Sequence, residues 1–120
     1  LSPFMRAALL GGYTKEGKEW IEALMEFSGE NEKIVRDFFA ENFPKVHFCR
    51  HRAGTLLWAD FREMGTEEEV YAWFQKAGVE PDLGSKYGEE GRGFLRLQIG
   101  MPKRELNYAL ERIKKAYVKE

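Results

Sequence analysis

A single apolar stripe through the first third of the 120-residue chain constrains the fold more than any other feature. Apolar side chains recur there at steps of three and four residues, the spacing of one face of an α-helix. The stripe consists of Trp20, Leu24, Phe27, Ile34 and Phe38, with Asn31 as one polar position inside it and Ile21, Met25, Val35 and Phe39 beside it. The pattern predicts one long helix over about residues 15–41, because Gly29 inside a helix costs only about 1 kcal/mol. Asn42 and Pro44 are predicted to end it.

A short helix is predicted before the long one. Ser2 and Pro3 form a typical helix opening, with a side-chain acceptor at the N-cap and proline at the first helical position. Residues 4–10 are apolar on nearly every side, which predicts that this helix is buried. Gly11 and Gly12 are predicted to end it.

The rest of the chain mixes strand and helix signals. Residues 46–49 and 55–61 alternate like two strands, which predicts a hairpin. Thr66 begins a capping box, which predicts a helix that Gly78 closes. Val79 is predicted to be strand-like, and residues 94–99 are predicted to form another strand. Pro102 is predicted to open the final helix. This order predicts a single domain over residues 1–120 with an α/β (α+β) two-layer sandwich fold. A small mixed or antiparallel sheet would pack against helices, with the long N-terminal helix as a connecting element.

Composition narrows the function classes. Lys and Arg number 19 and Asp and Glu number 20, and this balance argues against a nucleic-acid-binding protein. Cys49 is the single cysteine, so an intramolecular disulfide and a zinc site with several cysteines are both excluded. No apolar run approaches the ~18 residues of a membrane span, and the N-terminus does not resemble a signal peptide. These features predict a cytoplasmic protein without a nucleic-acid or membrane partner.

Arg96 is the first candidate binding residue. If Leu95, Leu97 and Ile99 face the helices, Arg96 lies on the opposite face of its strand. A guanidinium in the middle of a strand is costly to desolvate unless it meets an anion, and its planar fork matches a carboxylate. The functional interpretation is recognition of a substrate carboxylate. The alternative is an exposed arginine that pairs with Asp60 or with nothing.

Other candidates carry weaker signals. Residues 81–93 contain four glycines and no expected secondary structure, so they form either a functional loop or a mobile surface excursion. His47, Cys49 and His51 alternate along one strand, but no acidic fourth ligand is near them, so surface residues are favoured over a metal site or a catalytic dyad. Trp58 and Trp73 are interpreted as core or interface aromatic residues. No metal ligands are predicted.

Four segments in order resemble a known family. They are residues 54–62 (GTLLWADFR), 84–88 (GSKYG), 93–97 (GFLRL) and 101–104 (MPKR), the last of which precedes an amphipathic helix. Together they resemble the C-terminal small domain of class I/II (fold type I) pyridoxal-phosphate aminotransferases, nearest to the cystathionine β-lyase (MalY/PatB-type C–S lyase) branch. The resemblance covers the whole chain. One departure is Leu83, where many relatives have proline before the loop glycine.

The resemblance implies roles for particular residues. Arg96 matches the family arginine that binds the α-carboxylate of an amino-acid substrate. Gly84, Ser85, Tyr87 and Gly88 match a possible loop of the same site.

The resemblance also implies that part of the enzyme is absent. Family catalysis rests on a Schiff-base lysine, usually in an S-x-x-K motif, and on an aspartate that faces the pyridine nitrogen of the cofactor. Ser2, Ser28 and Ser85 are not followed by lysine three residues later. We therefore expect no catalytic and no cofactor-binding residue in this chain, which would be inactive alone. Pyridoxal 5′-phosphate would be bound mainly by a large domain that precedes Leu1, in a parent enzyme that is a homodimer.

Two functions remain open from the sequence. The first is the substrate-carboxylate-binding small domain of a pyridoxal-phosphate aminotransferase or C–S β-lyase that acts on amino acids similar to cystathionine. β-Elimination is preferred over transamination by resemblance alone. Parts of the first helix and Trp20 would then pack on the absent large domain. The alternative is a stand-alone α/β ligand-binding or regulatory module without catalysis, which a reading frame limited to these residues would favour.

Overall fold

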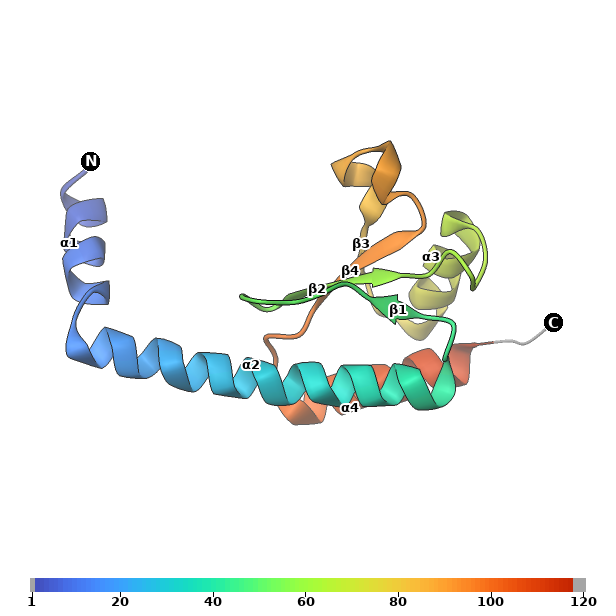
Figure 1. The fold of residues 1–120 in the computed structure, drawn as a ribbon, viewed down its shortest axis with the longest axis horizontal. Helices are drawn as coiled ribbons and strands as arrows, with labels where there is room; N and C mark the ends of the chain where they lie inside the picture. The colour runs from blue at the N-terminus through green and yellow to red at the C-terminus, as the bar shows by residue number, and fades with distance from the viewer. Residues whose placement is uncertain (1, 118–120) are drawn as a thin grey trace.

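The computed structural model describes residues 2–117, so residue 1 and residues 118–120 of the expected domain lie outside the described part. The elements in chain order are α1 (Pro3–Gly12), α2 (Lys15–Asn42), β1 (His47–Phe48), β2 (Leu56–Asp60), α3 (Glu67–Ala77), β3 (Asp82–Leu83), the 3₁₀ helices η1 (Gly84–Tyr87) and η2 (Glu89–Gly91), β4 (Phe94–Gln98) and α4 (Lys103–Ala116). The molecule is elongated, with extents of 55 × 30 × 25 Å, because α2 runs far beyond the sheet (Figure 1).

The sheet is antiparallel throughout, with the strand order β1-β2-β4-β3. The C-terminal half of α2 and the whole of α4 run beneath it, while α3 packs at one end (Figure 1). The expected two-layer fold and the predicted hairpin of β1 and β2 are confirmed. One face of the sheet is covered by helices, and the residues of β2 and β4 on the other face are partly exposed.

The core lies between the covered face of the sheet and the helices. Phe39 of α2 is completely buried at its centre, and its ring centroid lies 5.3 to 5.8 Å from those of four other phenylalanines. These neighbours are Phe38, Phe43, Phe48 and Phe61. Trp73 of α3 joins them, and its indole N–H donates to the Ile113 carbonyl of α4 at 2.8 Å. Aromatic rings from α2, β1 and α3, together with Phe61 directly after β2, therefore pack the sheet against the helices.

The predicted long helix is confirmed as α2, which passes through Gly29 without a break. Its core-facing side is centred on Asn31, Val35 and Phe39 rather than on the predicted Ile34 and Phe38, which are only partly buried. Asn31 is fully buried because its Nδ2 donates to the carbonyls of Ile99 at 2.7 Å and Met101 at 2.8 Å. The polar position inside the stripe thus ties α2 to the connection between β4 and α4.

The prediction that α1 is buried is wrong. No residue of α1 is buried, and the side chain of Phe4 is 87% exposed. The helix itself forms as expected, since the hydroxyl of Ser2 accepts a hydrogen bond from the Met5 amide at 3.3 Å. Apolar side chains are buried only where a partner surface exists, and the sheet and α4 lie against the other half of α2 (Figure 1). None of the described helices is both long and apolar enough to cross a membrane.

Two expectations about residues 79–93 are also corrected. Val79 is not in a strand; its amide donates to the Phe74 carbonyl after Gly78 closes α3 in the left-handed conformation. Residues 81–93 are not structureless, because they contain β3, η1 and η2. Gly84 and Gly91 make this compact path possible. A Cβ on Gly84 would lie 2.0 Å from the Gly91 carbonyl oxygen, so the two backbones approach at a distance that only glycine allows.

Candidate functional site

Arg96 lies in the middle of β4 on the open face of the sheet. Its neighbours in sequence, Leu95 and Leu97, point to the helical layer, where Leu95 is almost fully buried. The register places Trp58 of β2 on one side of Arg96 and Asp82 of β3 on the other. The alternation that predicted the orientation of Arg96 is therefore confirmed, and its side chain remains 32% exposed.

The partner of Arg96 within the chain is Asp82, not Asp60. Arg96 Nε and Nη2 both donate to Asp82 Oδ2, at 3.0 and 2.5 Å. Asp60 is instead engaged by Arg62, whose Nε and Nη2 donate to its two oxygens at 2.9 and 2.6 Å. The hydrogen bonds from Arg96 hold the pKa of the Asp82 carboxyl below its usual range, so Asp82 stays ionised beside it. The pairing with Asp60 considered from the sequence is wrong because β3 inserts a nearer carboxylate.

An aromatic ring lies against one face of the arginine and is itself part of an aromatic cluster. The ring of Tyr87, at the end of η1, has its centroid 4.7 Å from Arg96 Cζ, which is a cation–π contact. The Tyr87 centroid also lies 5.8 Å from that of Trp58, and Trp58 stacks on Phe94 at 5.9 Å. Arg96 is therefore held on one edge by a carboxylate and across one face by a ring.

The loop that carries Tyr87 is tethered by Glu67, which is only 7% exposed at the start of α3. The Ser85 hydroxyl donates to Glu67 Oε1 at 2.5 Å, while the amides of Gly93 and Ser85 donate to Oε2 at 3.1 and 3.4 Å. Burial raises the pKa of the Glu67 carboxyl, but these hydrogen bonds and the charge of Arg92 outweigh it, so the pKa lies below its ordinary value. One ionised side chain thus clamps both ends of the segment that contains η1 and η2.

The four predicted loop residues have different places in this arrangement. Gly84 makes the backbone contact with η2, Ser85 binds Glu67, and Gly88 turns the chain with φ of 134°. Tyr87 alone among them contacts Arg96. The sequence does not reveal the roles of Asp82 and Glu67, since acidic residues beside a loop or in the first turn of a helix usually lie in solvent. The role of Asp82 is recognised only from the pairing of β3 with β4, which places it opposite Arg96.

The histidines and the cysteine do not form a site together. Nδ1 of His51 lies 2.6 Å from Glu32 Oε2, whereas Nε2 of His47 lies 3.7 Å from Glu63. Cys49 is exposed. Within residues 2–117, no group of three or more His, Cys, Asp or Glu side chains is placed to hold a metal ion.

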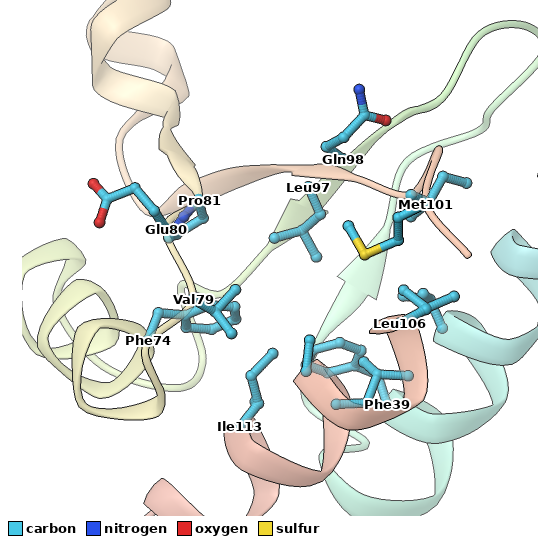
Figure 2. Close-up of a pocket in the computed structure, with 14 residues that line it drawn as sticks. Phe39, Phe74, Val79, Glu80, Pro81, Leu97, Gln98, Met101, Leu106 and Ile113 are labelled. Atoms are coloured by element: carbon cyan, nitrogen blue, oxygen red, sulfur yellow. The ribbon is translucent and has the colours of Figure 1, made fainter. Parts of the chain in front are cut away.

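The opposite side of β4 borders a cavity of about 120 Å³ (Figure 2). Leu97 points into it from the sheet, toward Phe39, Phe74 and Ile113 of the helical layer. Glu80 and Gln98 lie at its rim with their polar ends directed away from it (Figure 2). The side chains that face its interior are apolar, so it offers no acid, base or charged ligand group. Polar chemistry on β4 is confined to the face of Arg96.

Fold and site together define a small two-layer domain that presents an oriented arginine on an open sheet face. No protein-family model matches the chain. It is 33% identical to cystathionine beta-lyase PatB of Bacillus subtilis, over 97% of this chain and 30% of that protein. It is 31% identical to protein MalY of Escherichia coli, over 77% of this chain and 24% of that protein. The chain is homologous to the C-terminal region of pyridoxal-phosphate-dependent cystathionine β-lyases and aminotransferases. It spans less than a third of the length of these relatives.

Solved structures agree with this relation. Cystalysin from Treponema denticola, which contains a pyridoxal 5′-phosphate cofactor, superposes with a TM-score of 0.79 and 30% identity over 88% of this chain and 27% of its own. L,L-diaminopimelate aminotransferase from Chlamydomonas reinhardtii has the same fold over 98% of this chain and 29% of its own, with a TM-score of 0.81 and 24% identity.

The described residues do not fit pyridoxal phosphate by themselves. The buried side-chain atoms without a hydrogen-bond partner are Ser28 Oγ, Asn31 Oδ1 and His51 Nε2, and all three belong to α2 or to the connection between β1 and β2. Lys86, beside the site, lies 3.9 Å from Asp82 and is directed to that carboxylate. Among residues 2–117, the open face therefore offers Arg96 as a group for an anion and no prepared set of groups for a phosphate and a pyridine ring.

Proposed function

We propose that this chain is the substrate-carboxylate-binding small domain of a pyridoxal-phosphate-dependent enzyme that acts on amino acids. The observation that supports it most is Arg96, which is oriented on the open face of the sheet by Asp82 and has a side chain that is 32% exposed. In this proposal the cofactor and the Schiff-base lysine belong to a large domain outside the chain. The parent enzyme is cytoplasmic and acts as a homodimer.

The role of Arg96 follows from its chemistry. A guanidinium can give two parallel hydrogen bonds to the α-carboxylate of an amino acid, and this fixes the orientation of the substrate as well as its position. Orientation is important because the bond to be broken must stand in a defined direction to the cofactor. Lysine would supply a charge without the planar fork. Because PatB is named a cystathionine β-lyase, we propose C–S β-elimination as the reaction and transamination as the second candidate.

Substitution of Arg96 in the complete enzyme tests the proposal. Arg96→Lys and Arg96→Ala should raise KM for amino-acid substrates and lower kcat/KM, the alanine variant by a factor on the order of 10². A substrate analogue without the α-carboxylate should be almost indifferent to both changes. Arg62→Lys is the matched control, since Arg62 forms a similar pair with a carboxylate, Asp60, but lies outside the strands. Equal losses for substrate and analogue would show that Arg96 is structural.

A further inference from the structure

We infer that Asp82 is a positioning residue that fixes which edge of the Arg96 guanidinium is presented to a carboxylate. The inference rests on the proposed function of Arg96 and adds a second residue to that site. It assigns Asp82 a permanent place in the binding arrangement rather than that of a temporary occupant that the substrate displaces.

The hydrogen bonds of Arg96 define the free edge. A guanidinium has five N–H donors, on Nε, Nη1 and Nη2, and they form two usable edges. Asp82 Oδ2 accepts from Nε at 3.0 Å and from Nη2 at 2.5 Å, so the Nε–Nη2 edge is occupied. Within residues 2–117, Nη1 donates no hydrogen bond, and Nη2 has a second N–H. The terminal Nη1–Nη2 edge can therefore give two parallel hydrogen bonds to an incoming carboxylate.

Tyr87 limits the remaining freedom of the group. Its ring covers one face of the guanidinium at 4.7 Å from Cζ. With one edge bound to Asp82 and one face against the ring, rotation of the guanidinium would break both contacts. The terminal edge is thus presented in a single plane, which is the preorganisation that oriented binding needs.

Asp82 is itself held in place. It lies directly opposite Arg96 in the β3–β4 register, so the sheet sets its position. Lys86 Nζ lies 3.9 Å from the second oxygen, Oδ1, so Lys86 and Arg96 approach different oxygens of Asp82. The Glu67 contacts to Ser85 tether the start of η1, next to Lys86. A substrate carboxylate therefore meets an Arg96 side chain that is already bound to Asp82. It can bind the free Nη1–Nη2 edge of Arg96 without displacing Asp82.

Side-chain NMR of the 120-residue chain provides a test without ligand. We compare the Arg96 Nε–H signal in the wild type with that in Asp82→Asn and Asp82→Ala, with Asp60→Ala as the control. Asparagine retains an oxygen acceptor, whereas alanine does not. The Nε–H should exchange with water about tenfold faster in Asp82→Ala, the factor expected when a charge-assisted hydrogen bond is lost. It should be largely protected in Asp82→Asn and unchanged in Asp60→Ala. Equal exchange in Asp82→Ala and wild type would overturn the inference.

An acetate titration at constant ionic strength, with chloride as the control anion, then separates the inference from the proposed function. Acetate should shift the Arg96 Nη signals and leave the Nε–H signal and the Asp82 carboxyl carbon in place. If acetate also shifts the Arg96 Nε–H signal and the Asp82 carboxyl carbon signal, acetate displaces Asp82. That result would contradict the inference about Asp82 but not the proposal that Arg96 binds a carboxylate. If acetate shifts no Arg96 signal, the proposed function is contradicted, and the exchange experiment alone decides whether Asp82 orients Arg96.

Discussion

The two ends of α2 carry the same apolar periodicity, but the apolar side chains are exposed at the N-terminal end and buried at the C-terminal end. Residues 3–27, here termed the arm, contain no buried residue, and Trp20 is 67% exposed. Residues 28–117, the body, bury Val35 and Phe39 from the same helix almost completely. Apolar periodicity therefore identifies the face of a helix that packs against another apolar surface, but it does not indicate whether that surface lies within the chain.

The proposed function explains the arm. It carries a set of large, exposed apolar side chains, and exposed apolar surface of this kind often marks a contact with another part of a protein. The set comprises Phe4, Met5, Leu9, Leu10, Tyr13, Trp20, Ile21 and Met25. Since the relatives are more than three times as long as this chain, we propose that the preceding large domain covers the arm, while the body is complete in its own core.

Truncation of one aromatic residue in each region gives the largest contrast. Phe39→Ala removes a ring at the centre of the core and should lower the free energy of unfolding by about 3–5 kcal/mol. Trp20→Ala should change it by less than about 0.5 kcal/mol, because the ring is mostly in solvent. Urea unfolding of the two variants measures both. A comparable loss in Trp20→Ala would contradict the division into arm and body.

A second contrast lies at the boundary, where Ser28 and Asn31 are both buried and one turn apart. Asn31→Ala leaves the buried Ile99 carbonyl and the partly buried Met101 carbonyl without their donor and should cost about 1–3 kcal/mol. Ser28→Ala removes a hydroxyl oxygen that has no partner, so it should be neutral or slightly stabilising. Thermal unfolding under identical conditions compares the two. A loss in Ser28→Ala as large as that in Asn31→Ala would contradict the view that the contacts of Asn31 to the connection between β4 and α4 anchor the helix.

The smallest effect concerns the tether within the body. Because the pKa of Glu67 is below its ordinary value when folded, Glu67 contributes stability above its unfolded pKa of about 4.3. This contribution is lost as the pH falls through the lower folded pKa. The difference in stability between the wild type and Glu67→Gln should thus be about 1 kcal/mol near neutral pH and should shrink toward zero in acid. Unfolding at a series of pH values checks this, and a difference independent of pH would contradict the tether.

Much of the fold was predictable because local signals and tertiary structure agree in the body. The capping box at Thr66, the left-handed Gly78 and the alternation around Arg96 each determine a structure that packing then confirms. The partners of Arg96 were not predictable in this way. Asp82 faces it because two strands align in a particular register, and Glu67 reaches Ser85 through a contact between residues 18 positions apart. Such contacts depend on the whole fold, as does the exposure of α1.

The central claim is that the arm and Arg96 belong to a longer enzyme that supplies the cofactor. The most direct measurement is the intact mass of the protein that carries this sequence in its native source. The proposal predicts a mass about three to four times the 14.0 kDa of this chain, because the relatives exceed it by that factor. A native protein of 14.0 kDa would contradict the proposal and favour a stand-alone binding or regulatory module.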